Sequence, residues 1–185
     1  RTFIYDTSDP DFAVNQSKEF ASPAQTWDEA VVLRMKDGPL DFQMIEPPHQ
    51  LLAMPGVRLG MEFQITQEYT GQEKHLCWLV PKWKQILDYD IKGATRWNGA
   101  AGTLTHQLLK GAGTRTGGVW AISNLSDAAN WTGHFLHQAN YYGWGRLAWD
   151  PTLSAEQIAD EWIRCSMDNG YNHGVQQVVK HLLHT

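Results

Sequence analysis

The chain has 185 residues, of which 42% are hydrophobic and 19% charged, and this is the composition of an ordinary globular protein. The net charge of −5, with no Lys/Arg run longer than a pair, argues against a nucleic-acid-binding surface, which needs a clustered basic face. No apolar stretch approaches the roughly 20 residues of a membrane span. The nine tryptophans suit either a packed core or the flat platforms of a sugar-binding cleft, and composition does not choose between them.

Short apolar runs rich in β-branched residues alternate with helical patterns over the first two thirds of the chain. The runs predict strands at residues 2–5, 31–35, 59–66 and 119–123, and helices are expected at residues 12–20, 71–87 and 104–110. Pro81 must begin or kink the second of these helices. Residues 30–33 do not alternate with polar residues, which is typical of a strand covered on both faces. The alternation predicts an α/β fold with a parallel sheet.

The character of the sequence changes after about residue 130. Residues 131–148 are aromatic-rich and are expected to be helical up to Pro151, which breaks the helix. Ser154 and Gln157 have the spacing of a capping box that opens the next helix. A further helix is expected from near Asn172. Three successive helices predict the start of an all-α region.

Both ends of the chain fall inside expected elements. Residues 1–5 read as a strand without an initiator Met, and residues 178–185 read as the middle of a helix. We therefore expect a fragment of a longer protein.

Polar residues follow each expected strand, at Lys36 to Asp41, at Gln67 to Tyr69 and at Asn124 to Asp127. Active sites of (β/α)₈ barrels lie at the carboxyl ends of the strands, but an open doubly wound sheet also binds ligands there. Periodicity alone leaves both architectures open. The chain has no Gly-x-Gly-x-x-Gly after a strand, which counts against a dinucleotide-binding dehydrogenase.

Four charged residues stand within, at the end of, or just past these strands: Arg1, Lys36, Asp41 and Glu68. Paired carboxylates suit general acid/base work on a glycosidic bond. Arg and Lys beside them suit a substrate carboxylate, so the combination suggests an acidic sugar.

Four blocks of the sequence carry a resemblance to a known family. They are KDGPLDFQ at residues 36–43 with EP at 46–47, EFQITQEYTGQ at 62–72, NWTGH at 130–134 and GRLAWDPTLSAE at 145–156. In this order they resemble the family 67 α-glucuronidases, over essentially the whole chain. These enzymes hydrolyse, with inversion and without a metal, the α-1,2 bond between (4-O-methyl)glucuronic acid and xylooligosaccharides.

The resemblance assigns roles to matching positions. It implies that Asp41 and Glu68 form the general-base pair, and that Lys36 and Arg1 bind the uronate carboxylate. The family's general acid is a glutamate on an earlier strand, for which this chain offers no candidate. The chain alone is therefore expected to be inactive. It is also expected to be poorly soluble or molten, because half a barrel leaves two open sheet edges and an exposed apolar face.

The resemblance also sets the expected fold and partners. Residues 1–138 are expected to form the second half of a (β/α)₈ barrel, and residues 139–185 the start of an α-helical C-terminal domain. The expected partners are glucuronoxylan-derived oligosaccharides (aldouronic acids), with a homodimer for the full-length protein and no nucleic acid or membrane. No cofactor is expected, since the two cysteines and the His134/His137 pair lack the further ligands of a zinc site.

Two alternatives to this enzyme remain at the level of sequence. One is a non-catalytic carbohydrate-binding protein on the same barrel fold, which the aromatic content favours but the two acids, Asp41 and Glu68, do not. The other is a dehydrogenase or a different α/β enzyme, against which the missing phosphate loop argues.

Overall fold

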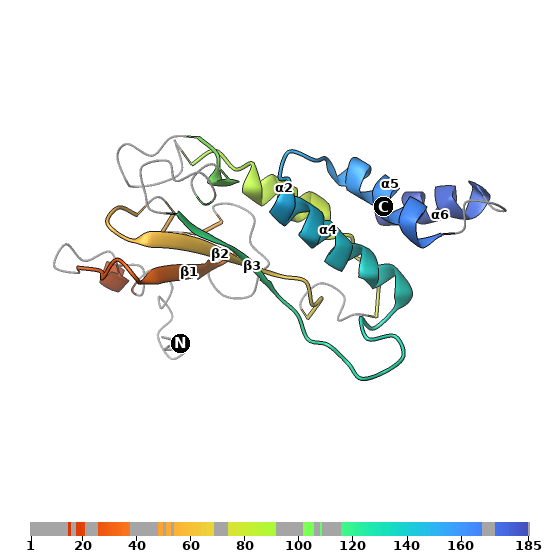
Figure 1. Cartoon of the computed structure of the whole chain (residues 1–185), viewed down its shortest axis with the longest axis horizontal. Coiled ribbons are helices and arrows are strands. Elements are labelled where there is room, and N and C mark those ends of the chain that lie inside the picture. Colours follow the sequence, from red (N-terminus) through yellow and green to blue (C-terminus); the bar gives the residue numbers. More distant parts are fainter. Residues whose placement is uncertain are drawn as a thin grey trace. The chain divides into compact units, whose positions relative to one another are not determined.

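The computed structural model describes residues 15, 18–20, 26–37, 48–49, 51–52, 54–68, 74–91, 102–105, 108, 116–167 and 173–184. The chain divides into two compact units. Figure 1 shows the helices and strands that they contain. The first consists of Arg1–Glu62 and Asp88–Trp120, and the second of Phe63–Leu87 and Ala121–Thr185.

A three-stranded sheet, in the order β1-β2-β3, is built from β1 (Val32–Lys36), β2 (Arg58–Gln64) and β3 (Thr116–Ile122). Strands β1 and β2 run parallel, with Val32 opposite Arg58 and Lys36 opposite Glu62. Five consecutive residues of β2, from 59 to 63, are buried, as in a strand covered on both faces. The sequence-based prediction of a parallel pair is confirmed for β1 and β2.

Two glycines in the first unit permit close contact where larger residues do not fit. A Cβ atom on Gly60 would lie 2.0 Å from the Trp120 ring, and one on Gly117 would lie 1.9 Å from the Leu59 carbonyl oxygen. The missing side chains therefore allow the Trp120 ring and the backbone of β3 to approach β2.

The second unit is mainly helical. It contains α2 (Val80–Leu87), the 3₁₀ turn η1 (Phe135–His137), α4 (Gln138–Trp149), α5 (Ala155–Ser166) and α6 (His173–His184). Helix α4 packs against α2 and α5, and α5 packs against α6. The helical core consists of buried side chains from α4, α5 and α6, namely Ala139, Ala159, Trp162, Ile163, Val179 and Leu183.

The capping box predicted at the start of α5 is present. The Ser154 hydroxyl oxygen accepts the Gln157 backbone N–H at 3.2 Å, and Gln157 Oε1 accepts the Ser154 backbone N–H at 2.8 Å. Helix α4 ends at Trp149, shortly before Pro151, as expected. Helix α6 begins at His173, next to the expected start.

Two predicted helices are wrong at their first residues. Residues 74–79 are not helical and α2 begins only at Val80. The expectation that Pro81 begins or kinks a helix is confirmed, because Pro81 has no N–H and lies in the first helical turn. Residues 131–134 form turns, and the helical conformation starts at Phe135. Gly133 has φ +90°, which no helix accommodates, so it delays that start.

The other expected elements are described in part. Asn15 and residues 18–20 are helical, as are Leu104, Thr105 and Leu108, in line with the helices expected there. The strand expected at residues 2–5 lies outside the described residues.

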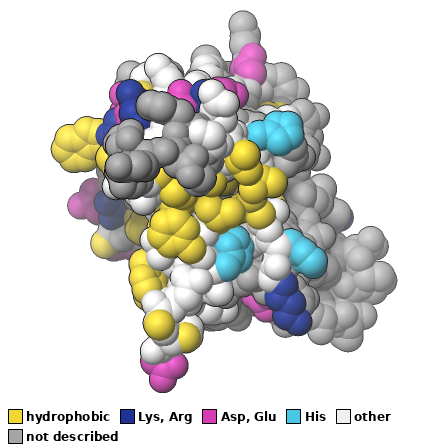
Figure 2. Space-filling model, turned by 90° about the vertical axis from the view of Figure 1, so that its right-hand side faces the viewer, with side chains coloured by type: hydrophobic (Ala, Val, Ile, Leu, Met, Phe, Trp, Pro, Cys, Tyr) yellow, Lys and Arg dark blue, Asp and Glu magenta, His cyan; other side chains and the backbone are white. Residues whose placement is uncertain are grey.

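The described surface carries several large apolar side chains. Figure 2 shows one face on which hydrophobic side chains gather with histidines beside them. The exposed large hydrophobic residues of the described ranges are Trp120, Leu125, Trp131, Phe135, Trp149, Val178 and Leu182. None of the helices described has the length and apolar character needed to cross a membrane.

Candidate functional site

Lys36 is the last residue of β1 and lies half-buried in register with Glu62 of β2. Its chain neighbour Asp37 is buried and donates its backbone N–H to the Glu62 carbonyl oxygen at 2.9 Å. The backbone bonding between β1 and β2 thus continues one residue past Lys36 and holds it at the carboxyl end of the strand.

Glu62 is fully buried in β2 and forms an ion pair with Arg34, whose Nε lies 2.7 Å from Glu62 Oε2. A buried carboxylate needs such a partner, because an isolated buried charge is costly. This contact gives Glu62 a structural role in pairing the two strands.

Glu68 follows the end of β2 by four residues and its side chain is exposed. Its Oε2 accepts a hydrogen bond from Gln64 Nε2 at 3.2 Å. A carboxylate that is exposed and lightly held in this way can reach water or a bound substrate.

The residues before Glu68 are buried and tied to the end of β3. The Ile65 backbone N–H donates to the Ile122 carbonyl oxygen at 2.9 Å. The Thr66 hydroxyl accepts the Asn124 backbone N–H at 2.5 Å and donates to Ser123 Oγ at 3.2 Å. The Ser123 hydroxyl is in turn hydrogen-bonded to the Tyr141 hydroxyl of α4.

A second connection runs through the backbone of Cys77. Its carbonyl oxygen accepts the side-chain amide of Gln67 at 2.7 Å and that of Asn140, from α4, at 2.8 Å. Asn140 Oδ1 accepts the Leu79 backbone N–H at 2.9 Å. The segment that leads into Glu68 is therefore linked to α4 by two hydrogen-bonded routes, one through Ser123 and one through Cys77.

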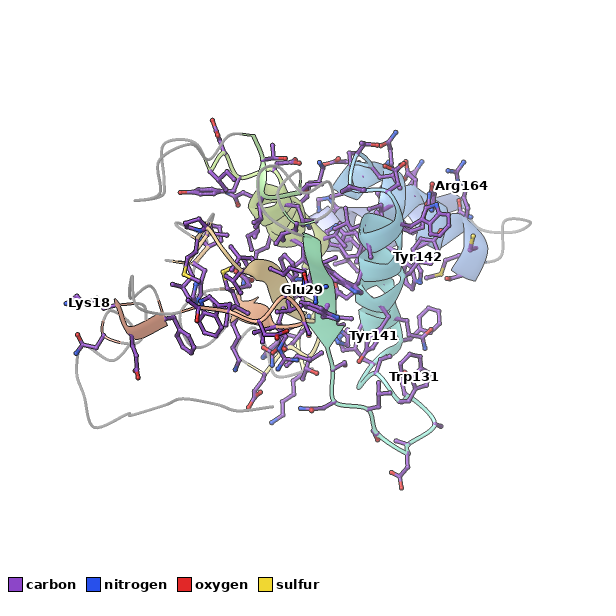
Figure 3. The ribbon with its side chains drawn as sticks, turned by 60° about the vertical axis from the view of Figure 1, so that its left-hand side comes forward. Lys18, Glu29, Trp131, Tyr141, Tyr142 and Arg164 are labelled. Atoms are coloured by element: carbon purple, nitrogen blue, oxygen red, sulfur yellow. The ribbon has the colours of Figure 1, made fainter. Side chains whose placement is uncertain are left out.

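An aromatic group lies beside this network. The Trp131 ring packs edge-to-face on the Tyr141 ring at 5.0 Å, and Figure 3 shows the two side by side. Tyr141 packs in the same way on His137 at 5.6 Å. Trp131 is 39% exposed, so it is packed at its edge and open to solvent over part of its surface.

The pKa of His137 is lowered to about 4, mainly by burial and to a smaller extent by the neighbouring His134. The ring centroids of the two histidines lie 5.8 Å apart. Among the residues described, no group of three His, Cys, Asp or Glu side chains is placed to hold a metal ion.

Of the four residues singled out from the sequence, Lys36 and Glu68 are placed and Arg1 and Asp41 lie outside the described residues. Lys36 belongs to the first compact unit and Glu68 to the second. Their meeting around one substrate stays a prediction.

The sequence analysis gave no role to Gln67, Asn140 and Tyr141, whose hydrogen bonds link the segment before Glu68 to α4. Asn140 is the one polar, non-aromatic side chain in the stretch 139–142, within a helix that is otherwise rich in aromatic residues. A buried amide in such a stretch needs hydrogen-bond partners, and this requirement could have indicated a structural role for Asn140.

Two family models match consecutive parts of the chain. The glycosyl hydrolase family 67 middle domain matches residues 1–131, and the glycosyl hydrolase family 67 C-terminus matches residues 132–185.

Curated relatives match nearly the whole chain. A probable alpha-glucuronidase A of Aspergillus niger is 34% identical over 183 residues, which cover 95% of this chain and 21% of the relative. A probable alpha-glucuronidase A of Aspergillus clavatus is 36% identical over 171 residues, 89% of this chain and 20% of the relative. Alpha-glucuronidase A of Emericella nidulans is 30% identical over 178 residues, 91% of this chain and 21% of the relative. The chain thus spans about a fifth of the length of these relatives.

Proposed function

Because this chain belongs to glycosyl hydrolase family 67, we propose that it acts within an α-glucuronidase that removes (4-O-methyl)glucuronic acid from xylooligosaccharides. The observation that carries the proposal is the match of both family models, end to end, together with relatives that bear the name alpha-glucuronidase. Since the chain spans about a fifth of those relatives, the activity belongs to the full protein that contains it.

The proposed architecture is the second half of a (β/α)₈ barrel over residues 1–138, followed by the start of an α-helical C-terminal domain. The parallel pairing of β1 and β2 and the burial of β2 on both faces support a barrel-type sheet. The run of α4, α5 and α6 supports a helical region after it.

The proposed roles follow the family motifs. Lys36 and Arg1 bind the uronate carboxylate, while Asp41 and Glu68 form the base pair that activates a water molecule. Lys36 ends β1 and Glu68 follows β2, and barrel enzymes carry their chemistry at these strand ends. The exposure of the Glu68 side chain leaves its carboxylate accessible to water.

The reaction proceeds with inversion. In an inverting glycosidase a general acid protonates the leaving oxygen, and a base about 6.5–9.5 Å away activates water on the opposite face of the sugar. We assign the base side to this chain and the acid to a glutamate elsewhere in the full protein.

The test measures release of glucuronic acid from a defined aldouronic acid by the full protein and by its Asp41→Asn and Glu68→Gln variants. Loss of one carboxylate is expected to lower kcat by at least about 100-fold, in the range of a lost general base. NMR of the fresh product is expected to give the inverted anomer. Glu19→Gln, which changes an exposed acid outside these strand ends, serves as the matched control and is expected to keep full activity.

The outcomes separate the proposed enzyme from its alternative. Wild-type protein that binds the aldouronic acid without releasing glucuronic acid is a carbohydrate-binding protein. Full activity in both acid variants removes the roles assigned to Asp41 and Glu68.

We also propose that the full protein is a homodimer, as expected from the family resemblance. Sedimentation equilibrium is expected to give twice the mass of one chain, and a monomer mass at micromolar concentration contradicts this.

A further inference from the structure

Resting on the proposed role of Glu68, we propose that Asn140 is a positioning residue for this carboxylate, acting from helix α4 through the Cys77 carbonyl and Gln67. Helix α4 belongs to the part matched by the family's C-terminal model, whereas Glu68 belongs to the middle domain. The C-terminal segment would thereby set the geometry of the base.

The Cys77 carbonyl oxygen is the shared point of this arrangement. It accepts Gln67 Nε2 at 2.7 Å and Asn140 Nδ2 at 2.8 Å, which uses both of its lone pairs. Gln67 is fully buried and Asn140 is 1% exposed, so both donor side chains are buried, while Cys77 itself is half-buried. Gln67 directly precedes Glu68, so its position constrains where the carboxylate begins.

Asn140 is held at three points. Its Oδ1 accepts the Leu79 backbone N–H at 2.9 Å, which directs Nδ2 toward the Cys77 carbonyl and toward His137 Nδ1 at 3.1 Å. His137 Nδ1 must then be the acceptor, so its proton resides on Nε2. The amide of Asn140 thus has a single orientation, and no rotation of it preserves all three bonds.

The next residue of α4 provides a second connection. The Tyr141 hydroxyl bonds to Ser123, whose hydroxyl accepts the Thr66 hydroxyl at 3.2 Å. Two consecutive residues of α4 therefore hold the two residues that precede Glu68. Tyr141 holds Thr66 through Ser123, and Asn140 holds Gln67 through Cys77.

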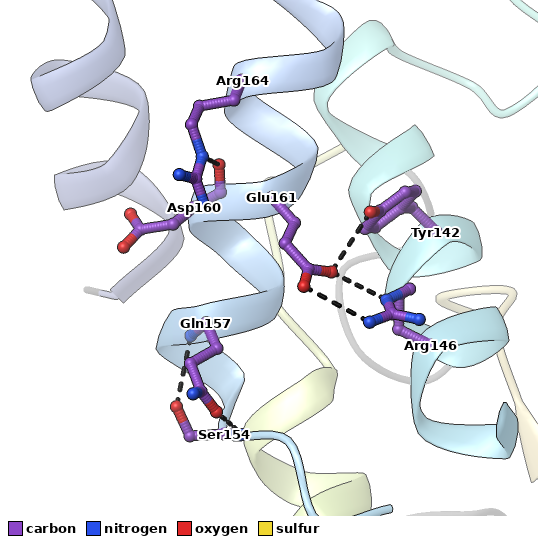
Figure 4. A network of polar contacts seen from close by, with 7 residues as sticks. All are labelled: Tyr142, Arg146, Ser154, Gln157, Asp160, Glu161 and Arg164. Atoms are coloured by element: carbon purple, nitrogen blue, oxygen red, sulfur yellow. Dashed lines mark hydrogen bonds and ion pairs between the residues drawn. The ribbon is translucent and has the colours of Figure 1, made fainter. Parts of the chain in front are cut away.

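Helix α4, which provides these contacts, is itself held in place by α5. Arg146 donates to Glu161 of α5 in a two-pronged ion pair, from Nε at 2.7 Å and from one terminal nitrogen at 3.3 Å (Figure 4). The Tyr142 hydroxyl donates to the same carboxylate at 3.2 Å. Ala139 is buried in the helical core, so both the polar and the apolar sides of α4 are anchored to α5.

Such anchoring matters because the Glu68 side chain is exposed and is contacted by Gln64, the last residue of β2. A general base must lie within hydrogen-bond reach of the water that it activates. A misplacement of about 1 Å can cost about 100-fold in rate. Restraining Thr66 and Gln67 is therefore a means of keeping the following carboxylate in place.

The test uses Asn140→Asp in the full protein, because the carboxylate keeps the acceptor for Leu79 N–H and loses both donors. We expect kcat on the aldouronic acid to fall about 10- to 100-fold. We expect KM to change less than threefold, since substrate-binding groups stay in place. Gln138→Glu, the same chemical change two residues earlier in α4, is the control and is expected to keep the wild-type kcat.

A background carrying Glu68→Gln distinguishes positioning from a general structural effect. If Asn140 acts through Glu68, adding Asn140→Asp to this background lowers the single-turnover rate less than twofold. If Asn140 only supports folding, the same 10- to 100-fold loss appears in both backgrounds, and the proposal is overturned.

A second variant covers the case in which Asn140→Asp does not fold. Tyr141→Phe removes only the hydroxyl that reaches Ser123, and we expect it to lower kcat three- to tenfold with the thermal midpoint nearly unchanged. Wild-type kcat in a folded Asn140→Asp protein, or in Tyr141→Phe where the former does not fold, overturns the proposal. Loss of activity in Glu68→Gln with wild-type rates in these variants leaves the proposed function standing and removes only this inference.

Discussion

At the scale of single residues, local sequence patterns predicted the partners of buried polar side chains least well. Glu62 is a carboxylate inside an expected strand. Its register partner in β1 is Lys36, and only the side-chain contacts of the folded chain show that it pairs with Arg34, two residues earlier in β1. Asn140 bonds to a carbonyl 63 residues away, and no local pattern encodes such a contact. The partners of both residues are known only once the positions of the strands and helices are known.

His137 makes stability depend on pH. Its folded pKa is lowered to about 4, mainly by burial and further by His134, whereas an unfolded histidine binds a proton near pH 6.5. Lowering the pH from 6.5 to 4 therefore protonates the unfolded chain first and favours unfolding, and the stability present above pH 6.5 is lost over this window. His49, which is half-buried and whose pKa desolvation also lowers to about 4, acts in the same direction.

The measurement is the urea midpoint of the full protein at pH 7 and at pH 5. We expect the midpoint to be lower at pH 5, and we expect His137→Gln to reduce the difference because it removes one titrating group. Adding His49→Gln should reduce it again. A difference that stays at the wild-type size in both variants contradicts the assignment.

At the scale of elements, the sequence patterns predicted most of the described strands and helices, but they predicted the first residues of two helices incorrectly. The β-branched runs located β1, β2 and β3 to within three residues, and the Ser154 capping box located α5. The sequence pattern suggests that the helices include residues 74–79 and 131–134. Instead, one helix starts next to Pro81, which lacks an N–H, and the other starts after Gly133, which has a positive φ. Backbone constraints at one residue therefore override a pattern that needs several.

Two glycines of α4 differ in what surrounds them, which allows a matched comparison. A Cβ atom on Gly143 would lie 2.3 Å from Val80 Cγ2 and 3.2 Å from the Trp78 ring, while one on Gly145 would meet nothing within 4 Å. Gly143→Ala is expected to push α4 away from α2 and to cost about 1–3 kcal/mol of stability. Gly145→Ala is expected to gain about 0.5–1 kcal/mol, because alanine favours the helix.

Chemical denaturation of the two variants beside the wild-type protein measures this difference. A Gly143→Ala protein as stable as Gly145→Ala would mean that α4 does not approach Val80 as closely as described. Since Asn140 lies one turn before Gly143, the clashing variant is also expected to lower kcat, whereas its neighbour is not.

At the scale of the whole molecule, we expect the site and the core to extend beyond what these residues supply. The chain spans about a fifth of its curated relatives. Its described sheet has three strands, and its described surface carries large apolar side chains, with Trp149 85% exposed. Large exposed apolar side chains that gather into a patch ordinarily lie against other parts of a protein.

We therefore expect the 185-residue chain, made alone, to release no glucuronic acid and to melt without a sharp transition. Calorimetry tests the second expectation, because a cooperative domain of this size absorbs heat in one narrow peak. The control is the same chain produced together with the rest of the full protein as a separate polypeptide. If complementary segments reassemble, both the narrow peak and the activity should return, since the missing surface and the general acid are then supplied. A sharp transition in the isolated chain would show that its own core suffices, and turnover by it would show that an acid has been overlooked among its residues.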